Sequence, residues 1–135
     1  MQQHLLDWVA SNGAEVVSAE NLVDFIAQLE SLPWAGMHLD WTQLDGIEVD
    51  LRRPDLSLER ARIGRCDLAL AFIDSASGGI VAPIRSIIES LDELYWTSPG
   101  YRYICGASGN LQGKFTLEFN SIGEYDGGHV LRLRA

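Results

Sequence analysis

Two stretches near the start of the chain place apolar side chains three or four residues apart, the spacing that is typical of amphipathic helices. The first, residues 4–11, ends before Gly13, a residue type that commonly stops a helix. The second, residues 18–32, starts at Ser18, a favourable N-cap, and ends at Pro33. The apolar positions are Leu5, Leu6, Trp8 and Val9 in the first stretch and Leu22, Phe25, Ile26, Leu29 and Leu32 in the second.

An alternation of apolar and polar residues follows and predicts a hairpin between residues 37–42 and 47–52. The Asp-Gly dipeptide between them is a common hairpin turn. A two-residue turn would place Trp41 opposite an aspartate, whereas a three-residue loop with a glycine bulge at Gly46 places it opposite Val49. We therefore expect the three-residue loop.

The middle of the chain predicts a buried strand, a loop and a third helix. Residues 67–73 are a short and almost continuous apolar run, which is typical of a buried strand, and the loop Ser75–Gly79 follows. Helical spacing begins near Ile80, with Pro83 tolerated in the first turn. The apolar face of this helix comprises Ile80, Ile84, Ile87, Ile88, Leu91 and Leu94.

The rest of the chain predicts strands at residues 101–105, 114–119 and 129–134, whereas residues 56–65 fit either a short helix or an exposed strand. This order favours a single α+β domain, residues 1–135, with a mainly antiparallel sheet of about five strands and three helices packed on one face. We expect one core made of Leu22, Phe25, Ile26, Leu29, Leu70, Phe72, Ile84, Ile87, Ile88, Leu91, Phe115 and Leu117.

Charged residues are distributed unevenly along the chain. The net charge is −9, and the first 51 residues contain nine Asp or Glu and no Lys or Arg. Nucleic acid repels an acidic protein, so we expect no DNA or RNA partner and instead expect a basic protein partner. The next fourteen residues contain five arginines, which leave a small phosphate site open; they are Arg52, Arg53, Arg60, Arg62 and Arg65.

Hydropathy and cysteine usage indicate a cytoplasmic protein with free thiols. No apolar run approaches the roughly 18–20 residues of a membrane span, so no membrane partner is expected. Residues 1–7 carry no Lys, no Arg and no long apolar stretch, so no signal peptide is expected. Cys66 and Cys105 lie beside apolar stretches and form no zinc-type cluster, so we expect buried, reduced thiols and neither metal nor cofactor.

Catalytic and nucleotide-binding motifs are missing from the sequence, which contains no GxxxxGK[ST], GxGxxG or GxSxG pattern. His4, His38 and His129 lie on different predicted elements and lack metal-ligand spacing. We therefore expect no enzyme activity. The alternative is a small-ligand or anion-binding domain, or an enzyme, that uses the loop Ser75–Gly79 together with the arginine cluster Arg52–Arg65.

Three acids on the predicted third helix form the main candidate binding site. Glu89, Asp92 and Glu93 share one helix face, where they repel one another, and they lie toward the negative end of the helix dipole. An arrangement that lowers stability indicates a binding role. We expect three further acids to extend this negative surface toward a basic partner: Asp40, Asp45 and Glu48.

Aromatic residues near acids add to this candidate site, because protein interfaces are rich in Trp and Tyr. Trp34, Tyr95, Tyr101 and Tyr125 belong to this group. Trp96, at the predicted end of the third helix, is expected to be exposed and to contact the partner. We expect Trp8 and Trp41 to be core residues instead.

In size and charge the chain resembles bacterial immunity proteins that neutralise nuclease toxins. The resemblance implies a small acidic inhibitor that binds the basic surface of a toxin stoichiometrically, and it rests on size and charge rather than on a motif. A further alternative is a structural protein that dimerises through a sheet edge such as residues 130–134. The sequence is therefore compatible with a monomer or a homodimer.

Overall fold

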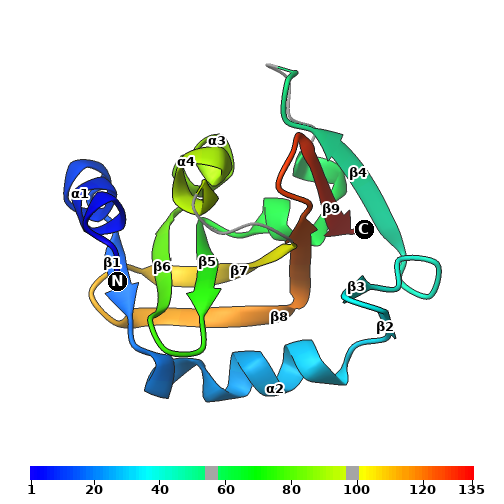
Figure 1. Ribbon diagram of the computed structural model, residues 1–135, viewed down its shortest axis with the longest axis horizontal. Helices are drawn as coiled ribbons and strands as arrows, with labels where there is room; N and C mark the ends of the chain where they lie inside the picture. The colour runs from blue at the N-terminus through cyan, green and yellow to red at the C-terminus, as the bar shows by residue number, and fades with distance from the viewer. Residues whose placement is uncertain (54–57, 97–100) are drawn as a thin grey trace.

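An antiparallel sheet of seven strands organises the part of the chain that the computed structural model describes, residues 1–53, 58–96 and 101–135 (Figure 1). In spatial order its strands are β1 (Glu15–Val17), β6 (Gly78–Pro83), β5 (Leu68–Asp74), β7 (Arg102–Asn110), β8 (Lys114–Tyr125), β9 (Val130–Arg134) and β4 (Gly46–Asp50). A separate small sheet pairs β2 (Trp34–Ala35) with β3 (His38–Leu39). The predicted α+β class and antiparallel pairing are confirmed, although the sheet is larger than predicted.

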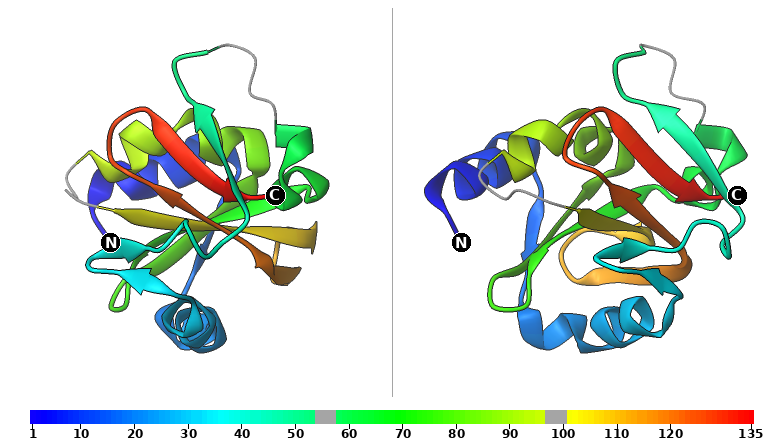
Figure 2. Two further views of the ribbon diagram at one scale, coloured as in Figure 1. Left: turned by 90° about the vertical axis from the view of Figure 1, so that its right-hand side faces the viewer. Right: turned by 45° about the vertical axis from the view of Figure 1, so that its right-hand side comes forward.

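Helices cover both faces of this sheet (Figures 1 and 2). One face packs against α1 (Gln3–Asn12), α3 (Ile84–Glu89) and α4 (Leu91–Tyr95), and the other against α2 (Val23–Ser31). The 3-10 helices of the described residues are η1 (Ala19–Leu22), η2 (Leu58–Arg60) and η3 (Arg62–Arg65). The prediction that the helices share one face is wrong, because the central strands are apolar on both sides and each side needs a cover.

The sheet divides the core into two layers. Successive side chains of a strand point to opposite faces, so β5 gives Ala69 and Ala71 to the layer under α1, α3 and α4, and Leu68 to the layer under α2. The predicted single core is therefore divided into two core layers, one on each face of the sheet. Ile84, Ile87, Ile88 and Leu91 belong to the first layer, and Leu22, Phe25, Ile26, Leu29, Leu70, Phe72, Phe115 and Leu117 belong to the second.

The first two predicted helices are present with altered boundaries. α1 ends at Gly13, whose φ of 60° gives the left-handed cap that glycine favours. The second stretch is divided, because residues 19–22 form η1 and α2 begins only at Val23.

Residues 80–83 belong to a strand and not to the first turn of the predicted third helix. β6 pairs with β5 on one side and with β1 on the other. Ile80, Val81 and Ala82 are all fully buried, because this inner strand contacts both core layers. A strand that is buried on both faces has a continuous apolar run, which spacing alone does not separate from a helix.

The third helix begins at Ile84 and is interrupted at Ser90, which separates α3 from α4. Ser90 has φ −113° and ψ 13°, outside the α-helical region. Its carbonyl oxygen accepts the Leu94 N–H at 2.8 Å, so Ser90 is the N-cap of a new helix. The interruption places two of the three predicted acids, Asp92 and Glu93, in the first turn of a helix and leaves Glu89 at the end of one.

The predicted hairpin between residues 37–42 and 47–52 is wrong in its pairing. β3 pairs with β2, and β4 pairs with β9, so that Val49 lies opposite Leu131 and not opposite Trp41. Alternation identifies a strand but not its partner, and β9, near the end of the sequence, alternates as well.

The remaining predicted strands are confirmed as β5, β7, β8 and β9, and β7 and β8 extend beyond the predicted ends. The ambiguous segment 56–65 forms η2 and η3 where it is described. Its first two residues, and the predicted helix end at residues 97–100, lie outside the described residues. The strand suggested as a dimer edge is not an edge strand, because β9 lies between β8 and β4; the outermost strands of the described sheet are β1 and β4.

Candidate functional site

The three acids of the predicted third helix do not form one continuous negative face. Glu89 and Asp92 line a hollow of about 330 Å³ together with Arg52 and Arg53, so two arginines share their surroundings. Glu93 lines a different hollow, beside α1. The structure thus brings part of the arginine cluster to two of the three acids.

Asp92 makes a contact that the sequence does not reveal. Its carboxylate accepts a hydrogen bond from the hydroxyl group of Tyr125, a fully buried residue of β8, and the same hydroxyl lies 2.6 Å from the carbonyl oxygen of Gly128. Because the helix restarts after Ser90, Asp92 and Glu93 occupy the first turn of α4, where negative charge is favourable. For Asp92 and Glu93, the argument that the helix dipole makes them destabilising is therefore wrong, whereas Glu89 is the last residue of α3 and lies at its negative end, as predicted.

Asp92→Asn is expected to lower the free energy of unfolding by about 1 kcal/mol, because it removes a favourable charge from the first turn of α4 and weakens the bond from Tyr125. Glu93→Gln removes the same charge from the same turn and should lower it by only about 0.3 kcal/mol. Urea denaturation of both variants measures the difference. An Asp92→Asn protein as stable as the parent would contradict the assigned role of Asp92.

Asp40, Asp45 and Glu48 lie on the β3–β4 connection and on β4, away from α3 and α4 (Figure 1). The Asp40 carboxylate accepts the Thr42 hydroxyl at 2.5 Å, and this bond is the main reason why the pKa of Asp40 is lower than usual. Glu48 forms an ion pair with Arg132 at 3.2 Å. These three acids are therefore separate from the acids of α3 and α4, and their role in binding stays a prediction.

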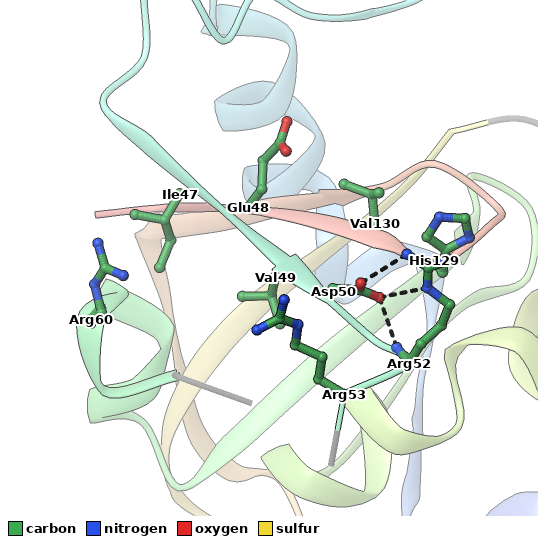
Figure 3. A pocket seen from close by; sticks show the side chains of 9 residues that line it. All are labelled: Ile47, Glu48, Val49, Asp50, Arg52, Arg53, Arg60, His129 and Val130. Atoms are coloured by element: carbon green, nitrogen blue, oxygen red, sulfur yellow. Dashed lines mark hydrogen bonds and ion pairs between the residues drawn. The ribbon is translucent and has the colours of Figure 1, made fainter. Parts of the chain in front are cut away.

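Part of the arginine cluster borders a pocket of about 460 Å³ beside the edge strand β4, here named the arginine pocket (Figure 3). The guanidinium group of Arg52 donates two hydrogen bonds to the carboxylate of Asp50, at 3.0 and 2.9 Å, and these bonds hold the pKa of Asp50 well below its usual range. The titratable lining residues are Glu48, Asp50, Arg52, Arg53, Arg60 and His129. Two acids therefore offset much of the positive charge that an anion would require.

The other two arginines of the cluster lie elsewhere. Arg62 and Arg65 line a separate hollow next to Cys66, and Arg62 donates a hydrogen bond to the carbonyl oxygen of Ala135 at 2.8 Å. The cluster that is continuous in sequence is thus divided in space.

The loop Ser75–Gly79 does not join the arginine pocket. It forms the turn between β5 and β6, at the end of these strands that lies near α2 (Figure 1). The Asp74 carboxylate accepts the N–H groups of Ala76 and Ser77, at 2.9 and 2.5 Å, so a carboxylate already occupies the donors that a phosphate would need. The strand β6 follows this turn, where the sequence predicted a helix. The helix N-terminus that was expected to bind an anion is therefore absent at this place in the described residues.

An aromatic surface forms where the β2–β3 hairpin packs against the start of β7. The rings of Trp34 and Tyr103 meet edge-on with centroids 5.5 Å apart, and the rings of His38 and Tyr101 lie 5.1 Å apart. Met37, at the hairpin turn, is 87% exposed, and Trp34 is 37% exposed. These five residues are named the hairpin surface.

A buried carboxylate fixes the hairpin surface to the main sheet. Glu124 of β8 is fully buried, and its two oxygens accept the Leu39 N–H at 2.7 Å and the Trp41 indole N–H at 3.1 Å. The indole N–H of Trp34 donates to the carbonyl oxygen of Leu29 at 3.2 Å and ties the hairpin to α2. A surface anchored in this way loses little conformational entropy on binding.

Sequence reasoning selected Trp34 and Tyr101 but missed the other members of the hairpin surface. It also selected Tyr95 and Tyr125 as interface residues, which is wrong, because both are buried in the core. The available signal was the short segment from Trp34 to Leu39, in which the two-residue turn Gly36-Met37 separates Trp34-Ala35 from His38-Leu39. Such a turn places its second residue, Met37, at the tip.

The three remaining tryptophans of the sequence differ in exposure. Trp8 is buried in the core, as predicted, whereas Trp41 is only partly buried. Trp96 is 71% exposed, as predicted, and its ring contacts that of His4 on α1, with centroids 5.8 Å apart. Trp96 therefore belongs to the α1 side of the sheet, opposite α2.

Both cysteines are free and buried, as predicted. Burial raises the pKa of the Cys105 thiol to about 12 and also raises the pKa of Cys66. Within the described residues, no group of three His, Cys, Asp or Glu side chains is arranged to hold a metal ion. No helix in that part of the chain is long and apolar enough to cross a membrane.

No protein-family model matches this chain, and no curated protein matches it significantly.

Proposed function

We propose that this chain is a small acidic immunity-type inhibitor, which binds a basic toxin of the nuclease kind stoichiometrically through its hairpin surface. The observation that carries the proposal is the exposure of Met37 and Trp34 on a hairpin that Glu124 holds in place. Large apolar and aromatic side chains on an anchored hairpin can supply the few residues that dominate the binding energy of a protein interface.

The charge of the surrounding chain supports a basic partner. The hairpin surface lies next to the C-terminal end of α2, which is exposed at Glu30, and the first 51 residues carry no Lys or Arg. A negative surface around an apolar centre accelerates association with a positive partner and excludes nucleic acid. The nucleic-acid site of a nuclease has the complementary positive charge.

Binding fits the molecule better than the alternatives. The arginine pocket contains two acids, and the loop Ser75–Gly79 is distant from it, so the two parts of the proposed anion site do not combine. β9 is an inner strand and offers no free edge for a dimer. We therefore propose protein binding rather than catalysis.

The test begins with purification of the tagged chain from its native cells and identification of the protein that co-purifies. That protein is then produced alone, and isothermal titration calorimetry measures its complex with the parent chain and with Trp34→Ala and Met37→Ser. We expect a one-to-one complex with a basic protein, a loss of affinity of about 10- to 100-fold for Trp34→Ala and about fivefold for Met37→Ser.

Trp96→Ala is the matched control, because Trp96 is more exposed than Trp34 and lies on the opposite side of the sheet. It should change the affinity by less than about twofold if the hairpin surface is the interface. A strong loss for Trp96→Ala, or for Glu89→Gln with Glu93→Gln, would place the interface on the α4 side instead. An acidic partner, or the absence of a binary complex, would contradict the proposed function itself.

A further inference from the structure

A groove of about 500 Å³ opens on the α2 side of the sheet, between η1 and the start of α2, β1 and the first half of β8. Phe25 lines its base and is fully buried, whereas Phe115, Leu117 and Phe119 of β8 are only partly buried. Because these three side chains recur at every second residue, they form a row of apolar positions along one face of the strand.

The strand edge beside this groove lacks a partner strand. β7 pairs with β8 along one edge, from Lys114 to Tyr125, whereas β9 pairs on the other edge only at Glu124 and Tyr125. In the described residues, no strand pairs with the outer edge of residues 114–120. The N–H and C=O groups of such an edge can pair with an extended chain.

A clamp fixes the wall of the groove. β1 and β8 are not neighbours in the sheet, but the Glu15 carboxylate of β1 accepts the N–H groups of Gln112 and Gly113 in the turn between β7 and β8, the latter at 3.1 Å. This contact holds the tip of the β7–β8 hairpin against β1. A groove that is held open in this way requires little ordering when a segment binds.

The charge of the groove favours a basic occupant. Glu15 and Asp24 line it, and no Lys or Arg does so in the part of the chain that the structure describes. Asp24 is exposed in the first turn of α2. Both acids lie on the α2 side of the sheet, as the apolar row does, so Lys or Arg side chains of a bound segment that face the groove would meet these carboxylates.

We propose that this groove binds an extended segment of the basic partner, in which apolar residues and Lys or Arg share the side-chain positions that face the groove, and that the segment adds to the outer edge of β8 as a further strand. Main-chain hydrogen bonds supply affinity in this mode of recognition, and the apolar row supplies specificity. The identity of the partner rests on the proposed function, whereas the chemistry of the groove can be tested without that partner.

The test titrates a short capped peptide, in which phenylalanine, valine and lysine stand at every second position and threonine stands between them, into the full chain and follows backbone amide signals by NMR. We expect the largest shifts at residues 114–120. The same peptide with N-methylated backbone amides, and a version with glutamate in place of lysine, should each bind at least about tenfold more weakly. Equal binding by either control peptide, or shifts centred outside the groove, would overturn the proposal.

Asp24→Lys and Glu30→Lys form a matched pair, because both reverse an exposed acid of α2 and only Asp24 lines the groove. Asp24→Lys should weaken peptide binding about fivefold or more, whereas Glu30→Lys should change it by less than about twofold. Equal effects of the two variants would show that only overall charge attracts the peptide, and the groove would then be rejected.

The same pair separates this proposal from the proposed function. If the purified partner depends on Trp34 but binds equally to the parent chain and to Asp24→Lys, the groove proposal fails and the proposed function stands. If the peptide binds the groove but no basic protein binds through Trp34, the proposed function fails and the groove remains a site for extended basic segments.

Discussion

Glu124→Ala is expected to lower the free energy of unfolding by about 2–4 kcal/mol, because it leaves the buried N–H group of Leu39 and the part-buried indole N–H group of Trp41 without their acceptor. Urea denaturation measures this loss. The same variant should accelerate hydrogen exchange at the Leu39 amide and weaken partner binding, since the hairpin surface is then no longer fixed to β8.

Glu124→Gln is the control for this variant. Its side chain has nearly the same volume and keeps one acceptor oxygen, so it can satisfy one of the two donors and should lose about half as much stability as Glu124→Ala. If Glu124→Ala lost less than about 1 kcal/mol, Glu124 would not be the anchor of the hairpin surface.

Gly78→Ala is expected to lower the free energy of unfolding by at least about 3 kcal/mol, because the site combines a positive φ with a close backbone contact. Its φ is 86°, and an added Cβ would lie 2.0 Å from the carbonyl oxygen of Val17 on β1. The chain would have to separate β1 from β6 to accept the methyl group. Thermal and urea denaturation measure the effect.

Gly13→Ala separates the cost of the positive φ from the cost of the close backbone contact. Gly13 also has a positive φ, 60°, but its added Cβ would meet no atom within 4 Å, so only conformational strain of about 1 kcal/mol is expected. Equal losses for the two variants would mean that β1 does not pack closely on Gly78. A larger loss of stability for Gly78→Ala would show that close packing against β1 requires a glycine at this position. No anion bound at the turn is then needed to account for Gly78.

The elements that sequence reasoning predicted correctly are those whose pattern is local. α1 and α2 have one apolar face each, and a strand such as β9 alternates clearly. The start of β6 was predicted to be helical, because Ile80 stands at helical spacing from the apolar residues of α3. Ile80, Val81 and Ala82 are apolar for another reason: the strand is buried on both faces of the sheet.

The candidate site was harder to predict, because its residues depend on pairing between distant segments. The acids of α4 changed their electrostatic meaning when Ser90 interrupted the helix, which spacing did not indicate. The hairpin surface brings Trp34 and Met37 close to Tyr103, which lies more than 60 positions later in the sequence. Its anchor, Glu124, looks like any other strand acid until its burial is known.

The long-range pairing of the sheet also governs when the hairpin surface can exist during synthesis. Leu39 is held by a residue that lies 85 positions later in the chain, and β4 is held by β9. Contacts between distant segments form only after both segments are available, and they form slowly. A growing chain therefore carries Trp34 and Met37 long before β8 and β9 provide their support. During synthesis the binding residues are therefore present before the hairpin that makes them able to bind is fixed in place.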